Sequence, residues 1–391
     1  MLSSSSVDIK LIKYHRELNV IIGFFFKLWR LDFIPDSKWE FVNYLRVLLS
    51  PISWTFCGLC SLWHILHMED YDDLIDVSFT IIFVFAFYQC NMIYLTTHLS
   101  NKQNIMKILK FFDEAIVSDE YLLSDLRKKF YFRNTKIAFY VGRVFLTLVT
   151  ISGMIITIFD IYQARTHFPL FWRLPGIPTT SIFYYPCNYI FQTLMYFSGL
   201  EIIFSADVVI IITILYCDAE LRVLLELVKD LDDEDVVQSR AKFTISLIHR
   251  VHLMISDRAD QLTKSLWHIY FHKLFAIMMY LCSVMFIFTK VEASLLVPFL
   301  IAVMMISQIF MLCYFGQIIR DCSDDMAQCL YETRWYELHI VDQKDLLMLM
   351  VRFQYPIKVE TFGFGAISIY TFVQIFKASV SYAMILYTVF N

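Results

Sequence analysis

The chain alternates between long apolar runs and shorter polar segments, and this pattern predicts the elements of the fold. A hydrocarbon core about 30 Å thick takes roughly 20 residues of α-helix to cross, and seven runs are long enough. The predicted spans are Tyr44–Leu66, Ile75–Thr97, Ile137–Phe159, Cys187–Cys217, Leu266–Thr289, Ser294–Ile319 and Gly363–Phe390. None of the runs sustains the period of two that a membrane β-barrel needs. We therefore predict an all-α membrane protein with seven transmembrane helices.

Lys and Arg residues are distributed unequally between the two sides of this topology. The N-terminal segment and the loops after the second, fourth and sixth spans hold 26 of the 33, whereas the other loops hold three. Because cytoplasmic loops are enriched in Lys and Arg, we expect the N-terminus in the cytosol and the C-terminus outside the cell. This orientation is inverted relative to a G-protein-coupled receptor.

Composition and motifs remove several classes of function. The chain is 58% hydrophobic with a net charge of -4, and it lacks the basic cluster of a nucleic-acid-binding protein. Common enzyme motifs such as His-Glu-x-x-His and Gly-x-Ser-x-Gly do not occur. His268 and His272 have metal-compatible spacing, but without a third ligand nearby a structural pair is favoured. Packing is likewise favoured over redox chemistry for Cys57 and Cys60. We expect no enzyme activity, cofactor, metal or nucleic-acid partner.

Two charged residues inside the predicted spans need an explanation, because an ionised side chain is costly in a bilayer. Glu201 in the fourth span belongs either to an ion or ligand path or to a structural pair with a polar side chain on a neighbouring helix, and the second reading is favoured. Lys377 in the seventh span presents the same choice. Its place in a motif described below favours an ordered inward or interfacial position.

The outer halves of spans two, three and four carry a distinctive set of aromatic and small residues. Phe79, Phe83 and Phe87 form an aromatic stripe on span two. A weakly polar face on span three consists of Thr150, Gly153, Met154 and Thr157, and span four adds Phe191 and Met195 at helical spacing. One interpretation is ordinary helix packing, in which small residues let helices approach closely. The other is a pocket for a small apolar molecule with aromatic walls. Composition alone favours the packing interpretation.

Five motifs follow one another in the C-terminal part of the chain. They are Leu330–Glu337 (LYETRWYE), Leu346–Met350 (LLMLM), Gln354–Pro356 (QYP), Gly363–Phe364 and Thr371–Tyr382 (TFVQIFKASVSY). Their order and spacing resemble the C-terminal signature of insect odorant receptors. Chain length and inverted topology agree with that family, although upstream of the fifth span only the pattern matches. The Thr-Tyr and Gln-Phe motif of the related gustatory receptors is not found in the last span.

The resemblance implies a subunit of a ligand-gated, non-selective cation channel that is opened by a small volatile molecule. It implies a hetero-tetramer with a shared odorant co-receptor in the plasma membrane of sensory neurons. This chain lacks the long loop of the co-receptor between spans four and five, which identifies it as an odour-tuning subunit. The family's pore-facing positions fall on Ile385, Thr388 and Val389, where an apolar ring could close the pore by dewetting. Trp335 and Tyr336 are candidates for the contact between subunits.

These expectations divide the chain into four parts. Residues 1–43 form a cytosolic N-terminus, in which the short apolar run Val20–Phe26 predicts an interfacial or re-entrant helix. Residues 44–319 contain spans one to six and the ligand pocket, residues 320–362 form a cytosolic anchor segment, and residues 363–391 form the pore-lining span. A gustatory-type receptor channel and a secondary transporter remain alternatives, but the transporter would show internal repeats, and none is evident.

Overall fold

The structure is a computed structural model that describes residues 38–67, 74–100, 121–163, 180–290 and 296–390. It also describes short stretches between positions 13 and 24 and isolated positions between 103 and 177. The segment expected to form an interfacial helix, Val20–Phe26, therefore lies mostly outside the described residues.

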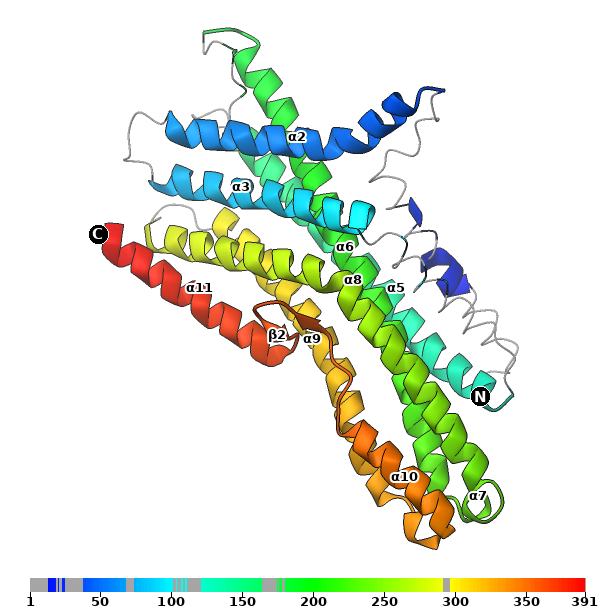
Figure 1. The fold of residues 1–391 in the computed structure, drawn as a ribbon. Coiled ribbons are helices and arrows are strands. Elements are labelled where there is room, and N and C mark those ends of the chain that lie inside the picture. Colours follow the sequence, from blue (N-terminus) through cyan, green and yellow to red (C-terminus); the bar gives the residue numbers. More distant parts are fainter. Residues whose placement is uncertain are drawn as a thin grey trace.

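Nearly all of the described chain is helical (Figure 1). The long helices are α2 (Glu40–Leu66), α3 (Leu74–Tyr94), α5 (Tyr121–Gln163), α6 (Tyr184–Lys229), α8 (Ala241–Lys290), α9 (Leu296–Glu332) and α11 (Ile369–Phe390). Shorter elements are the π-helical turn η1 (Leu95–Ser100), the 3-10 turns η3 (Asp230–Asp232) and η4 (Trp335–Glu337), and the helices α7 (Glu234–Ser239) and α10 (Ile340–Phe353). Two short strands, β1 (Glu360–Thr361) and β2 (Gly365–Ala366), complete the set.

The helices reproduce the predicted spans and extend beyond several of them. Within the described residues, α2, α3, α6, α8, α9 and α11 are long and apolar enough to cross a membrane. The run expected at Ile137–Phe159 lies inside α5, a helix of 43 residues. Besides α5, three helices continue well past the apolar runs: α6, α8 and α9 are 46, 50 and 37 residues long. The predicted all-α fold class is confirmed.

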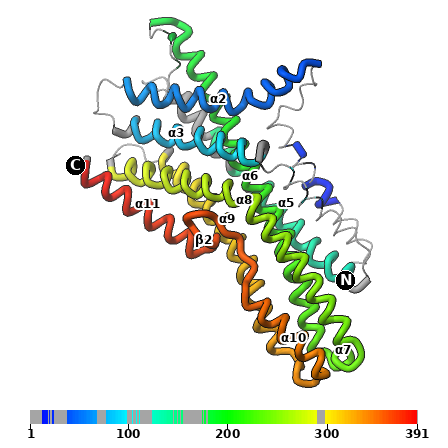
Figure 2. Tube along the Cα trace, in the orientation of Figure 1, coloured from blue at the N-terminus to red at the C-terminus, as the bar shows by residue number. Residues whose placement is uncertain are grey.

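The long helices form a bundle around α6 (Figures 1 and 2). Helix α6 packs against α3, α5, α8 and α9, and every residue from Ile202 to Leu221 is buried. A helix that is apolar around its whole circumference must be covered on every side by other helices or by lipid, and here neighbouring helices supply the cover. The composition of this run, VVIIITILY from Val208 to Tyr216, therefore accounts for the central position of α6.

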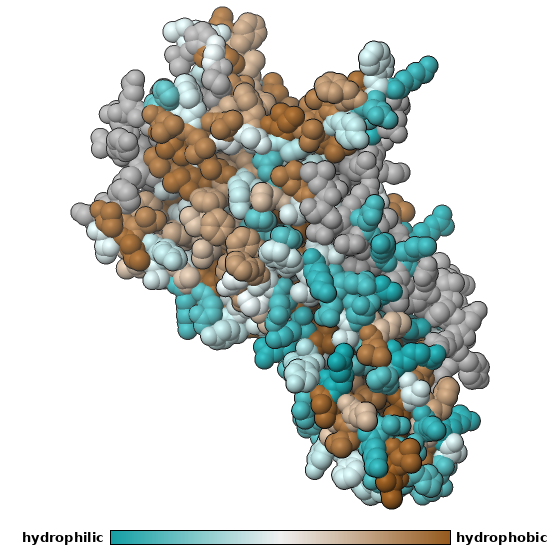
Figure 3. All heavy atoms as spheres, in the orientation of Figure 1, coloured by the Kyte–Doolittle hydropathy of each residue, from teal (hydrophilic) through white to brown (hydrophobic). Residues whose placement is uncertain are grey.

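Polar and apolar surfaces separate along the bundle (Figure 3). On the face shown, apolar residues gather over α2, α3 and the adjoining parts of α8 and α11, whereas hydrophilic residues become frequent towards the end that carries α7 and α10, where apolar residues are mixed with them. The C-terminal end of α11 lies far from α7 and α10. An apolar belt of this kind matches the surface that a protein exposes to lipid, and the hydrophilic end projects beyond it.

The start of the last helix differs from the sequence prediction. The seventh span was expected from Gly363, but α11 begins at Ile369 because residues 360–366 form a β-hairpin. Gly363 has a φ of 78° and Gly365 a φ of 71°, values that favour glycine because it has no Cβ. The Thr361 hydroxyl donates to the carbonyl of Trp267 at 2.8 Å, so the hairpin is fastened to α8.

Candidate ligand-binding site

An apolar cavity of about 70 Å³ lies between α3, α6, α8 and α9. Its walls are formed by Phe79, Ile82, Phe83, Ala86, Phe87 and Cys90 of α3, by Met195, Tyr196, Gly199, Leu200 and Ile203 of α6, by Tyr280 of α8, and by Ile301, Met304 and Met305 of α9. The walls are aliphatic, aromatic and thioether groups with few polar atoms. Such walls suit a small apolar ligand that is held by shape and dispersion.

The aromatic stripe on α3 forms one wall of this cavity. Phe79, Phe83 and Phe87 recur every four residues and therefore lie on one helix face. Met195 lines the cavity from α6, and Phe83 meets Tyr196 edge to face at 6.2 Å between ring centroids. Four of the residues singled out in the sequence are thus brought together around one cavity.

The face expected on span three does not reach this cavity. Thr150 is exposed, Met154 is 53% exposed, and Gly153 is covered by α6. A Cβ at Gly153 would approach the side chains of Leu200 and Phe197 to 3.2 and 3.3 Å, so glycine permits close packing of α5 on α6. These residues therefore do not line this cavity, and the contacts of Gly153 support the helix-packing interpretation of the face. The side chain of Thr157 lies outside the described residues.

Phe191 also lies away from the cavity. Its ring meets that of Phe56 on α2 edge to face at 6.2 Å. The wall that the sequence did not predict comes from α8 and α9, through Tyr280, Met304 and Met305. Periodicity identifies the face of a helix, but it does not show which neighbouring helix that face meets.

A buried ion pair lies next to the cavity. Lys273 of α8 and Asp207 of α6 form a salt bridge, with side-chain exposures of 0% and 1%. The Lys273 ammonium also donates to the carbonyl of the cavity residue Ile203 at 2.8 Å, and the Gln308 amide donates to Asp207 at 2.6 Å. Sequence reasoning favoured Glu201 as the polar residue needing a partner, but Glu201 is only half-buried. Opposite charges within two separate apolar runs are the signal that could have identified the pair.

His272 and the paired cysteines in the apolar runs are part of the helix packing, whereas His268 stacks on its chain neighbour Trp267. His272 Nδ1 lies 2.8 Å from the hydroxyl of Tyr88, which joins α8 to α3. Cys57 and Cys60 are buried and free in α2. Within the described residues, no group of three His, Cys, Asp or Glu side chains could hold a metal ion.

Helix α11 buries one side against the bundle. Ser379 donates to the carbonyl of Ile375 at 2.8 Å and approaches the carbonyl of Met278 on α8 at 3.4 Å. Ile385, Thr388 and Val389 are exposed in the single subunit, as is Lys377. The residues expected to face a pore are therefore free to meet another subunit or a lumen.

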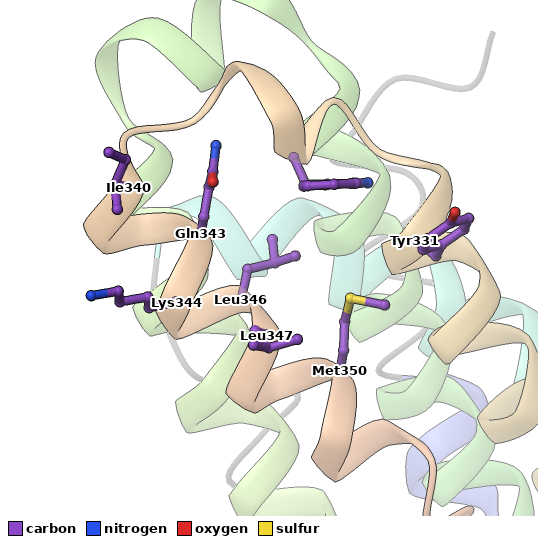
Figure 4. A pocket seen from close by; sticks show the side chains of 8 residues that line it. Tyr331, Ile340, Gln343, Lys344, Leu346, Leu347 and Met350 are labelled. Carbon is purple, nitrogen blue, oxygen red and sulfur yellow. The ribbon is translucent and has the colours of Figure 1, made fainter.

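An open groove of about 400 Å³ lies between the end of α9, η4 and α10. It is lined by Tyr331, Trp335, Ile340, Gln343, Lys344, Leu346, Leu347 and Met350. Figure 4 shows Leu346, Leu347 and Met350 projecting from α10, with Tyr331 across from them. Trp335 meets Tyr336 edge to face at 6.1 Å, and Tyr336 is 64% exposed. This concentration of exposed apolar side chains is typical of a surface that binds another protein.

Similarity to known proteins agrees with this architecture. The family model described as 7tm Odorant receptor matches residues 70–380. Odorant receptor 10 of Aedes albopictus is 22% identical over 297 residues, covering 74% of this chain and 77% of that protein. Odorant receptor 85f of Drosophila melanogaster is 32% identical over 80 residues, so the match covers 20% of each protein.

Solved structures show the same fold. The insect olfactory receptor OR5 of Machilis hrabei superposes with a TM-score of 0.79 at 12% identity, covering 97% of this chain and 98% of that one. Its complex with eugenol gives a TM-score of 0.75 at 14% identity, covering 98% and 99%. Because the family match extends over most of the chain and the fold agrees throughout, this multi-pass membrane protein belongs to the odorant receptor family, a family of receptors and not of enzymes.

Proposed function

We propose that this chain is the odour-tuning subunit of a ligand-gated, non-selective cation channel. The observation that carries the proposal is the apolar cavity enclosed by α3, α6, α8 and α9 in a chain of the odorant receptor family. A small volatile molecule would occupy it. A cavity of about 70 Å³ is smaller than the roughly 300–1,000 Å³ of drug-sized pockets, which favours a compact ligand.

Gating in this proposal is a shift between closed and open arrangements of the helices. A ligand moves such an equilibrium only by the difference between its affinities for the two arrangements. The cavity touches four helices, two of which, α8 and α9, pack directly on α11, and α8 has the larger contact with it. A change in the packing of α8 therefore has a direct contact through which to reach the proposed pore helix.

The proposed assembly is a hetero-tetramer with the odorant co-receptor in the plasma membrane of sensory neurons. Ile385, Thr388 and Val389 would face the central pore, and the groove beside η4 and α10 would bind the neighbouring subunit through Trp335 and Tyr336. The exposure of these side chains in the isolated subunit supports both assignments. The excess of Lys and Arg in alternate loops supports a cytosolic N-terminus and an extracellular C-terminus.

The proposal is tested by expressing the chain together with the co-receptor and recording current while volatile molecules are applied. An inward cation current that requires both subunits and a volatile ligand is the expected result. A response that depends on a G protein and occurs without conductance would contradict the channel mechanism. Surface labelling of the chain establishes that it has reached the membrane in either case.

A further inference from the structure

A buried hydrogen bond joins two helices beside the cavity. The hydroxyl of Tyr280 on α8 donates to the Oε1 atom of Gln89 on α3 at 2.7 Å. Gln89 is 0% exposed and Tyr280 is 1% exposed. Tyr280 lines the cavity, and the next residue after Gln89, Cys90, lines it as well. The Gln89 amide therefore lies directly beside an apolar wall.

One half of this amide has no partner. The Nε2 atom of Gln89 is buried and forms no hydrogen bond with any described residue. A primary amide has two N–H donors, and buried donors in folded proteins nearly always find an acceptor. Gln89 is not itself one of the residues that line the cavity, but its amide bonds directly to one of them, Tyr280, so the unpaired donor lies one side chain behind the wall, where a ligand oxygen that reaches past Tyr280 would bind it.

The Tyr280 hydroxyl fixes which half of the amide remains available. Because it donates to Oε1, the nitrogen is the free half, and a free nitrogen can only donate. The two amide atoms are bonded to the same carbon, so Nε2 lies near the Tyr280 hydroxyl. A ligand oxygen that reaches past Tyr280 would meet a positioned donor.

We infer that Gln89 determines ligand specificity by donating a hydrogen bond to an acceptor oxygen of the volatile ligand, with Tyr280 as its positioning residue. The preferred ligand is then a small carbonyl or ether compound whose hydrocarbon part fills the cavity. This inference rests on the proposed function and adds the chemical class of the ligand. Apolar walls discriminate weakly between similar shapes, whereas a site that hydrogen-bonds a ligand rejects analogues that lack the polar group.

Matched pairs of volatiles test this inference, because a C=O group and a C=CH2 group have nearly the same shape. The probes are acetophenone with α-methylstyrene, and cyclohexanone with methylenecyclohexane, applied to cells that express the chain and the co-receptor. In the wild type we expect each ketone to be about tenfold more potent than its alkene, equivalent to about 1.4 kcal/mol. In Gln89→Leu the ketone should lose this advantage while the alkene keeps its potency. Tyr280→Phe should reduce the ratio to a lesser degree, because the amide remains but is no longer held.

The response to the alkene shows that each variant is folded and accessible to ligand. Because both probes are applied to the same cells, the ratio of ketone potency to alkene potency does not depend on the expression level. Gln192→Leu is the matched control, because Gln192 is also buried with an unpaired amide atom but, unlike Gln89, forms no hydrogen bond with a residue of the cavity wall among the described residues. It should leave the ratio unchanged. Equal potencies of ketone and alkene in the wild type, or an equal loss of potency for both probes in Gln89→Leu, would overturn the inference about Gln89. Neither result would contradict the proposed channel function. No current with any volatile, despite surface expression and a working co-receptor, would instead contradict the proposed function.

Discussion

Lys273 on α8 and Asp207 on α6 form an ion pair inside the bundle, and both side chains are inaccessible to solvent. The pair is supported by Gln308, which donates to the carboxylate, and by the Ile203 carbonyl, which accepts from the ammonium. Three helices, α6, α8 and α9, thus converge on one polar cluster in an apolar interior. Buried ion pairs add little net stability, but the loss of one partner leaves an unpaired charge.

Asp207→Asn should therefore destabilise the protein by about 3 to 5 kcal/mol, because it leaves Lys273 charged and buried. The measurement is the thermal midpoint of the purified protein in detergent, with size-exclusion chromatography used to detect the loss of folded protein. The double variant Asp207→Leu with Lys273→Met should recover much of the loss. Lys264→Met, which removes an exposed lysine of the same helix, is the control and should have little effect. Equal midpoints for Asp207→Asn and the control would show that the pair contributes nothing.

The cavity assignment predicts opposite outcomes for two methionines on neighbouring helices. Met195→Ala should change agonist potency about tenfold or more, because Met195 lines the cavity, whereas Met154→Ala should leave it unchanged, because Met154 is exposed on α5. Phe83→Ala should behave as Met195→Ala does. Dose-response curves for a series of agonists of increasing size measure the effect. The reverse order, with Met154 sensitive and Met195 insensitive, would place the ligand beside α5.

The groove beside η4 and α10 predicts an assembly defect. Replacing both Trp335 and Tyr336 by Ala should reduce the amount of co-receptor that co-purifies with the chain several-fold, because large aromatic side chains dominate the energy of protein interfaces. Phe243→Ala, which removes an exposed aromatic ring from α8, is the control. If the double variant retains the co-receptor as well as the control does, the two rings belong to packing within one subunit.

The pore assignment predicts a leak when the apolar ring is made polar. Ile385→Ser should increase the current measured without ligand, because a hydrophobic constriction that closes by dewetting admits water when it becomes polar. Thr388→Cys and Val389→Cys should permit block by a charged thiol reagent applied from outside. Ser379→Cys is the matched control, because Ser379 is buried against α8. Modification at 388 and 389 without any change in current would remove this face of α11 from the pore.

The hydrophilic end of α8 predicts a pH-dependent stability. His252 lies before the apolar span of α8, packs on Phe353 of α10, and has its pKa lowered to about 4 by burial and by the nearby charges of Arg352 and His249. Its unfolded pKa is about 6.5, so the unfolded chain binds more protons between these values. Stability is therefore full above pH 6.5 and falls as the pH drops towards 4, by up to about 3 kcal/mol.

The thermal midpoint between pH 7.5 and pH 5 measures this dependence. His252→Gln should flatten the curve, whereas His339→Gln, at an exposed position, should not. An unchanged slope in His252→Gln would assign the acid sensitivity to other groups.

Local sequence patterns predicted the helices well because they depend on the period and length of single segments. The runs at Ile75–Thr97 and Leu266–Thr289 fall within the helical stretches α3–η1 and α8. The stripe of Phe79, Phe83 and Phe87 was recognised from the same period, and its residues meet around one cavity.

Relationships between helices were harder to predict. The pairing of Gln89 with Tyr280 joins residues 191 positions apart, and nothing in either segment identifies its partner. The weakly polar face of α5 is compatible with both interpretations, because small residues suit both a cavity wall and a close helix contact. At Gly153 the closeness of Leu200 and Phe197 supports the helix contact.

The uninterrupted course of α6 gives the molecule a lever arm. Between Met195 at the cavity and Lys229 at its end, α6 is about 50 Å long at 1.5 Å per residue, so a tilt of about one degree moves the far end by about 1 Å. Directly beyond that end, Arg334 lies 3.8 Å from Asp232 of η3 and from Glu234 of α7. A tilt of α6 by about one degree at the cavity would therefore shift η3 and α7 by about 1 Å relative to Arg334, which precedes the groove residue Trp335.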